Sequence, residues 1–141
     1  MPDIQHRIII NGSPKKIYHA LTTAEGLSSW WTKGTKAEAV VGYVAEFPFG
    51  DSVTKMEILD LKPDAQVKWK CVSGPNDWLD SIITFNLEAK NDASIVRFVQ
   101  HDHKAGDFYG HCNTKWAYFL LSLKSYLETG KGSPYPDDVK F

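Results

Sequence analysis

The strongest constraint on the fold is an apolar stripe that recurs about every 3.6 residues from Asp107 to Thr129. Its members are Phe108, Cys112, Trp116, Phe119, Leu120, Leu123, Tyr126 and Leu127. Gly130 follows, and glycine is the residue type that most often closes a helix. A helix of this length spans about 34 Å, and a nine-residue strand spans about 30 Å. The pattern therefore predicts one long amphipathic helix that can lie along the whole inner face of a sheet.

The segment before this helix is typical of an antiparallel meander. From Ala37 to His101, short runs of β-branched and aromatic residues are separated by turn residues, and no helical period interrupts them. The expected strands are 37–41, 43–48, 53–61, 66–72, 79–88 and 93–101. The sequence thus predicts six consecutive antiparallel strands.

Alternation within these strands predicts which side chains face the helix. Lys68 and Lys70 are charged and are expected to face water, so the residues that alternate with them face inward. The expected inward residues are Val67, Trp69, Cys71, Met56, Ile58, Ile83, Phe85, Leu87, Val96, Phe98 and Gln100. The expected outward residues are Lys55, Glu57, Thr84, Asn86, Glu88 and Arg97.

The N-terminal part supplies one more strand and two short helices. Residues 4–10 are rich in isoleucine and end at an Asn-Gly pair, which predicts a strand and a turn. The Ser-Pro pair at 13–14 provides an N-cap and a first-turn proline for one helix. A second helix is expected from Thr22 or Thr23 to the tryptophan pair at 30–31.

Composition narrows the class of protein. The chain has 141 residues, with 16 Lys and Arg interspersed among 17 Asp and Glu, so no basic face is available for nucleic acid or anionic lipid. No apolar run approaches the roughly 18 residues of a membrane span, and the N-terminus lacks the features of a secretory leader. We therefore expect one domain over residues 1–141, in the cytoplasm, with neither nucleic acid nor a membrane as partner.

Cysteine and aromatic content bear on the interior. Cys71 and Cys112 make no disulfide framework and lack the spacing of zinc ligands, so we expect reduced thiols and no cofactor. Aromatic residues make up 13% of the chain, and each ring can bury about 150–250 Å². This excess predicts either a very large core or a hollow that is lined by rings.

The order of elements resembles the helix-grip fold of the START and pollen-allergen superfamily, also called SRPBCC. Within that order, several motifs are similar to the family of small proteins homologous to the activator of the Hsp90 ATPase. They are Ser13-Pro14, Leu27-x-x-Trp30-Trp31, Trp69, Ile83-Thr84-Phe85-Asn86-Leu87, Trp116, Leu120 and Leu123-Lys124-x-Tyr126-Leu127-Glu128-x-Gly130. The chain departs from the family at Gln100, where members often carry His, and at the lone Gly42, where they often carry two glycines.

The resemblance implies an α+β fold in which a curved antiparallel sheet of about six to seven strands surrounds the long C-terminal helix. It also implies a cavity between sheet and helix that takes lipids, plant hormones or polyketides, and that performs cyclisation or hydrolysis in a few branches. The family name implies a chaperone-activating role. That role belongs to larger eukaryotic proteins with an additional amino-terminal domain, which we do not expect before the strand at 4–10.

We favour non-covalent binding of a small, largely apolar ligand such as a lipid, a polyketide or an aromatic compound. The residues expected to contact it are Trp31, Met56, Trp69, Ser81, Ile83, Phe85, Phe98, Gln100, Phe108, Cys112 and Trp116. In this hypothesis the rings form walls, Met56 and Cys112 adapt to the ligand's shape, Gln100 and Ser81 anchor polar atoms, and Trp31 lies near the entrance. The alternative is a core in which the rings interdigitate, while polar groups such as Gln100 bond internally.

Two other functions stay open. A cyclase or hydrolase needs a titratable group on the inner face, but no carboxylate falls there, so we assign no catalytic residue. A chaperone-binding protein needs an exposed apolar patch, for which Leu121, Tyr118 and the 32–36 loop are candidates. Leu121 and Tyr118 lie off the helix stripe and are equally candidates for a homodimer contact, or for cover by the tail at 133–136.

The histidines near the long helix resemble a set of metal ligands. His101, His103 and His111 lie close in sequence to Asp102 and Asp107. Their spacing is not tight, and such histidines are more often solvated loop residues than ligands. We therefore predict no metal site.

Overall fold

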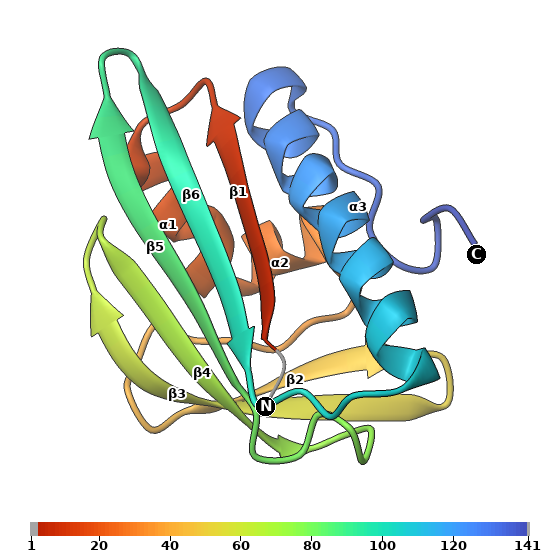
Figure 1. The fold of residues 1–141 in the computed structure, drawn as a ribbon. Helices are drawn as coiled ribbons and strands as arrows, with labels where there is room; N and C mark the ends of the chain where they lie inside the picture. Colours follow the sequence, from red (N-terminus) through yellow and green to blue (C-terminus); the bar gives the residue numbers. More distant parts are fainter. Residues whose placement is uncertain (1–2, 141) are drawn as a thin grey trace.

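The structure, a computed structural model, describes residues 3–140 (Figure 1). Its elements are β1 (Ile4–Ile10), α1 (Pro14–Thr22), α2 (Ala24–Trp30), β2 (Val44–Phe49), β3 (Ser52–Lys62), β4 (Gln66–Ser73), β5 (Ile82–Lys90), β6 (Ala93–His101) and α3 (Asp107–Thr129). This order confirms the expected strand, helix pair, meander and long helix.

The six strands form one antiparallel sheet in the order β1-β6-β5-β4-β3-β2. The N-terminal strand pairs with the last strand of the meander, so β1 and β2 are the two edges. The sheet curves, with α3 beside β1 and α2, and with α1 against β4 and β5 (Figure 1). The α+β helix-grip arrangement is therefore confirmed.

The long helix has the predicted bounds and the predicted stripe. It begins at Asp107 and ends at Gly130, whose left-handed conformation (φ 84°) closes it. The stripe residues that are fully packed are Cys112, Trp116, Phe119, Leu120 and Leu123. Tyr126 and Leu127 are partly buried against the same core, whereas Phe108, at the first turn, is more than a third exposed.

The predicted strand faces are confirmed, with one departure. All eleven residues that were expected inward are buried. Thr84 was expected outside, yet only 6% of it is exposed. It lies on a central strand opposite Lys68 on one neighbour and Val99 on the other. Side chains opposite each other on neighbouring strands are about 5 Å apart, so the larger neighbours shield the small threonine.

One predicted strand was wrong, and the start of another was wrong. Residues 37–41 form no strand, because hydrogen bonds from the Val40 amide to Glu38 and from the Tyr43 amide to Val40 fold this segment into turns. The β-branched Val40 suggested a strand but is 57% exposed. The meander therefore has five strands, and β1 completes the sheet of six. The strand expected at 79–88 begins only at Ile82, since residues 75–81 also form turns.

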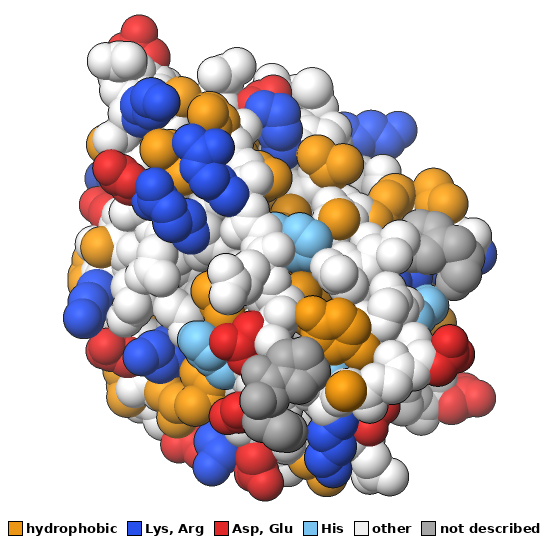
Figure 2. All heavy atoms as spheres, viewed as in Figure 1, with side chains coloured by type: hydrophobic (Ala, Val, Ile, Leu, Met, Phe, Trp, Pro, Cys, Tyr) orange, Lys and Arg blue, Asp and Glu red, His pale blue; other side chains and the backbone are white. Residues whose placement is uncertain are grey.

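The surface carries no face of one charge in the view of Figure 2, where Lys and Arg are interspersed with Asp and Glu. Apolar side chains appear there in small groups. Within residues 3–140, no helix is both long enough and apolar enough to cross a bilayer.

The contact between α1 and α2 leads to a test of the packing. A Cβ built at Gly26 in α2 lies 2.6 Å from the Cα of Ala20 in α1, whereas one built at Gly110 in α3 meets nothing within 4 Å. We expect Gly26→Ala to lower the free energy of unfolding by about 1–3 kcal/mol, because backbone must move to admit the methyl group. Gly110→Ala should raise it by about 0.5–1 kcal/mol through helix propensity. Urea unfolding followed by circular dichroism measures both, and equal effects of the two substitutions would contradict the packing described.

Candidate ligand pocket

Most of the volume between the sheet and the helices is filled by interlocking rings. Trp31, at the end of α2, stacks on Trp69 of β4 with ring centroids 5.9 Å apart and lies 5.0 Å from Trp116 of α3. Phe98 of β6 lies 4.4 Å from Trp116 and 5.2 Å from Phe85 of β5. The aromatic core thus runs without interruption from the sheet to the long helix.

The polar groups within this core are bonded to one another. The Gln100 amide donates to the hydroxyl of Ser81 (3.0 Å) and accepts from the indole N–H of Trp116 (3.0 Å). All three residues are buried. These bonds match the alternative in which Gln100 is satisfied internally. Two buried ring nitrogens differ: the Nε2 atoms of His6, on β1, and of His103, after β6, have no hydrogen-bond partner among the described residues.

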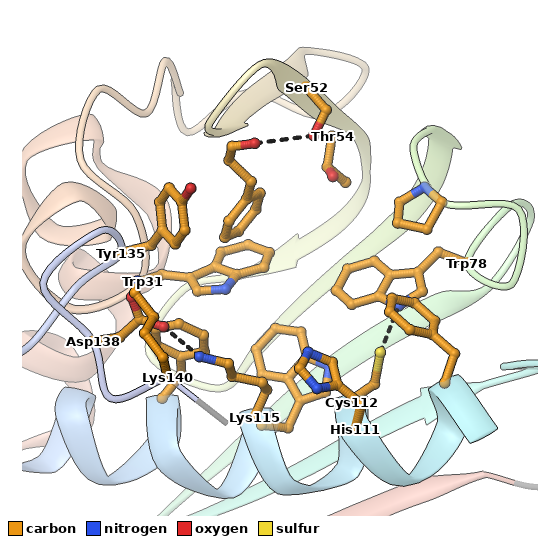
Figure 3. A pocket seen from close by; sticks show the side chains of 15 residues that line it. Trp31, Ser52, Thr54, Trp78, His111, Cys112, Lys115, Tyr135, Asp138 and Lys140 are labelled. Carbon is orange, nitrogen blue, oxygen red and sulfur yellow. Dashed lines mark hydrogen bonds and ion pairs between the residues drawn. The ribbon is translucent and has the colours of Figure 1, made fainter.

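A pocket of about 370 Å³ opens at one end of this core (Figure 3). It lies between the β2–β3 hairpin, the β4–β5 loop, the N-terminal half of α3 and the tail that follows α3. Its lining residues are Trp31, Phe49, Ser52, Thr54, Pro75, Trp78, Phe108, His111, Cys112, Lys115, Trp116, Phe119, Tyr135, Asp138 and Lys140. These four parts of the chain, together with Trp31 at the end of α2, therefore build one concave, mainly apolar surface.

Of the eleven predicted contact residues, four line this pocket: Trp31, Phe108, Cys112 and Trp116. The other seven lie outside its wall, buried in the core: Met56, Trp69, Ser81, Ile83, Phe85, Phe98 and Gln100. Trp31 was expected near an entrance, and it lines the pocket although it is almost fully buried.

Trp78, Phe49 and Tyr135 are aromatic lining residues that the sequence did not single out as ligand contacts, and Trp78 is the one with the clearest signal. Its indole N–H donates to the Sγ of Cys112 (3.3 Å), and its ring stacks on Trp116 with centroids 5.9 Å apart. A tryptophan within a loop of Gly, Pro, Asn and Asp is a usable signal, because so large an apolar side chain is rarely left in water. The loop before β5 thus places the indole of Trp78 in the pocket wall.

The charged end of the pocket is formed by Lys115 of α3 and by Asp138 and Lys140 of the tail (Figure 3). The Asp138 side chain is only 1% exposed and forms ion pairs with both lysines. Burial would raise the pKa of Asp138, but the hydrogen bonds from Lys115 and Lys140 outweigh it and hold the pKa below its usual value. Asp138 is therefore a carboxylate at neutral pH.

The cysteine in the wall is a poor nucleophile. Burial raises the pKa of the Cys112 thiol to about 11, despite the hydrogen bond from Trp78 that lowers it. The thiolate is the reactive form, so Cys112 stays protonated near pH 7. In this pocket it contributes a small apolar surface.

The histidines near α3 lie in different surroundings. His103 was expected to be a solvated loop residue, which was wrong: it is fully buried among the rings of Trp78, Phe108 and Tyr109. His101 is exposed and pairs with Asp3 at 3.0 Å. Within residues 3–140, no group of three or more His, Cys, Asp or Glu is placed to hold a metal ion.

Comparison with known proteins gives the family. The family model described as activator of Hsp90 ATPase homolog 1-like protein matches residues 11–128. The chain belongs to this family. Its sequence is 44% identical to that of Aha1 from Colwellia psychrerythraea, which was solved in solution as a dimer. The two structures match with a TM-score of 0.86 over 94% of this chain and 100% of that one.

More distant relatives share the fold alone. A crystal structure from Mesorhizobium loti is 21% identical, with a TM-score of 0.80 over 90% of this chain and 97% of that one. A solution structure from Bacillus halodurans is 18% identical, with a TM-score of 0.77 over 91% and 98%. None of the curated proteins matches the chain.

The ion pairs of Asp138 predict a pH-dependent contribution to stability. The pKa of Asp138 is lower in the folded protein than in the unfolded chain, so its stabilising effect is present above the unfolded value of about 4 and is lost as pH falls through the folded value. We expect Asp138→Asn to lower the free energy of unfolding at pH 7 by about 1–3 kcal/mol. This loss is smaller than the loss expected on breaking a fully buried ion pair, because the Lys140 side chain is exposed to water. Urea unfolding from pH 7 to pH 3 should show this deficit shrinking.

Asp80→Asn is the matched control for this prediction. Asp80 pairs with Lys70 at 3.8 Å but is 85% exposed. The control should change the free energy of unfolding by less than about 0.5 kcal/mol at every pH. A deficit in Asp138→Asn that stays constant down to pH 3 would show that the ion pairs are not its source.

Proposed function

We propose that this protein binds a small, largely apolar molecule without covalent chemistry, in the pocket between the β2–β3 hairpin, α3 and the C-terminal tail. The observation that carries the proposal is the pocket itself. It remains open in a protein whose other inner rings are packed against each other, and seven aromatic side chains contribute to its wall. Mainly apolar pockets with a few polar groups are the usual form of small-molecule sites.

The size of the pocket bounds the ligand. At about 30 Å³ for each water-sized group, a volume of 370 Å³ accommodates about a dozen non-hydrogen atoms. A medium-length acyl chain, a two-ring aromatic compound or part of a polyketide fits this size. A longer ligand would extend past the mouth into water.

The groups in the wall favour binding over catalysis. Cys112 stays protonated, and Asp138 is engaged by two lysines, so neither is suited to attack or to proton transfer near neutral pH. Gln100 and Ser81, which were expected to anchor a ligand, bond to each other behind the wall. A cyclase or hydrolase on this scaffold is the less supported alternative.

Binding should change tryptophan fluorescence, because Trp31, Trp78 and Trp116 all line the pocket. We expect a titration with acyl and aromatic compounds of 10–14 carbons to quench or shift the emission. His111→Trp places a larger ring at an exposed lining position and should weaken binding about tenfold by filling the mouth. His19→Trp, at an exposed position on α1 outside this pocket, is the control.

Two measurements decide the outcome. Isothermal titration calorimetry gives affinities that do not depend on the added indole, and native mass spectrometry of the purified protein detects a co-purified compound. Unchanged emission and no heat across the panel, with no co-purified compound, would overturn the proposal.

A second candidate function is contact with a chaperone. It is favoured by the family, described by activation of the Hsp90 ATPase, and by a 44% identical relative named Aha1. Leu121 of α3, one of the residues expected in an apolar contact patch, is 56% exposed. A pull-down with Hsp90 and a measurement of its ATPase rate test this function, and no capture with an unchanged rate would dispose of it.

We also propose that the chain forms a homodimer, as its Colwellia relative does. Light scattering after size exclusion should then give twice the 15.9 kDa of one chain. If Leu121 lies in the contact, Leu121→Lys should give monomers, whereas Val40→Lys, at an equally exposed valine in the turn before β2, should leave the dimer intact. A monomeric wild-type protein at 100 µM would overturn this proposal.

A further inference from the structure

We propose that the ligand of this pocket is an apolar carboxylic acid in its ionised form, and that its carboxylate replaces that of Asp138 on Lys115 and Lys140. This inference rests on the proposed binding function and specifies its ligand class. In this proposal Asp138 competes with the ligand, because its own carboxylate binds the two lysines that the ligand carboxylate would bind.

The balance of charge in the wall supports an anion. Among the lining residues, Lys115 and Lys140 carry positive charge and Asp138 alone carries negative charge. With His111 counted as neutral, the pocket has a net charge of +1. If Asp138 leaves the wall, a carboxylate in its place keeps the net charge at +1, whereas a neutral ligand would leave both lysines without an anion; an apolar body then matches the aromatic wall.

The environment of Lys115 explains why the ligand must displace Asp138 rather than bind beside it. The Lys115 ammonium is bonded to the Asp138 carboxylate and to the Val139 carbonyl oxygen (2.9 Å), and it lies 5.5 Å from the ring centre of Phe119. Its side chain is only 17% exposed. A shielded cation needs an anion beside it, and the position of that anion is held by Asp138.

The tail is attached in a way that allows the exchange. Tyr135 is anchored to the end of α2 by two backbone bonds, from its amide to the Trp31 carbonyl (2.8 Å) and from the Lys33 amide to its own carbonyl (3.0 Å). Residues 136–140 belong to no helix or strand. Beyond Tyr135, the side-chain contacts of this segment are made chiefly through lysine ammonium groups, including the exposed pair of Lys33 and Asp137. Asp138 can therefore leave the lysines while Tyr135 stays in place.

The test compares matched anionic and neutral ligands on the full chain at pH 7. Decanoate against decan-1-ol tests an aliphatic body, and 2-naphthoate against 2-naphthol tests an aromatic one, all below their aggregation limits. Affinities are measured by calorimetry for the wild type, Asp138→Asn and Lys115→Met, with Asp80→Asn as the matched charge control. Circular dichroism checks that each variant is folded.

We expect the wild type to prefer the anion of each pair. Asp138→Asn should strengthen anion binding about three- to tenfold by removing the competitor, with little change for the neutral compound. Lys115→Met should abolish the preference, and Asp80→Asn should behave as the wild type. In the wild type, amide NMR signals of residues 137–140 should shift with decanoate and much less with decan-1-ol. Which pair binds more tightly distinguishes a fatty acid from an aromatic acid.

Any of three results would overturn the inference. Equal affinities for anionic and neutral ligands in the wild type and in all variants would reject the carboxylate preference but leave the binding function standing. No binding of any of the four compounds to the wild type would reject both. If Asp138→Asn does not fold, Lys140→Met replaces it in the test, because the Lys140 side chain is 62% exposed and its loss should not disturb folding. Lys140→Met should weaken the binding of the anionic compounds only. An unchanged preference for the anion in this variant would reject the inference.

Discussion

The packing of tryptophan rings around Trp31 is the contact on which the rest of the structure depends. Trp31 ends α2, and its ring meets Phe47 of β2 at 4.4 Å, Trp69 of β4 at 5.9 Å and Trp116 of α3 at 5.0 Å. One side chain thus joins the short helices, the sheet and the long helix. Large rings bury more apolar surface than any other side chains, so this cluster supplies much of the force that holds α3 against the sheet.

The same rings decide where the interior is filled and where it is open. Toward β5 and β6, Phe98 packs against Trp116 and Phe85, and Phe85 packs in turn against Trp69, so rings fill this end. Toward the hairpin of β2 and β3, the small side chains of Ser52 and Thr54 face α3 across the pocket. The two alternatives raised by the aromatic excess, a filled core and a ring-lined hollow, therefore occur together at opposite ends of one cluster.

The charged end of the pocket depends on the tail. Lys115 alone would place a cation in an aromatic wall, where the loss of hydration is costly. Asp138 offsets this cost from a segment that lies 23 residues further along the chain. The tail consequently contributes to both stability and the chemistry of the wall, although it belongs to no regular element.

The sequence by itself determined the elements and their faces. The period of 3.6 in residues 107–129 and the alternation around Trp69 and Phe98 depend only on neighbours along the chain, and the structure confirms both. Local patterns failed where burial depends on distant partners. The β-branched Val40 suggested a strand, but no other part of the chain packs over it and it is exposed. His103 was predicted to be solvated, but Trp78 and the first turns of α3 enclose it.

Only the tertiary structure decided the site. Of the eleven residues predicted to contact a ligand, alternation correctly placed those on strands on the inner face, but it could not distinguish packed core from pocket wall. That distinction depends on how rings from separate elements fit together. The bond between Trp78 and Cys112 and the ion pair between Lys115 and Asp138 join residues 34 and 23 positions apart. No local spacing encodes such pairs, because they form only when the loop before β5 and the tail after α3 close on the same half of the long helix.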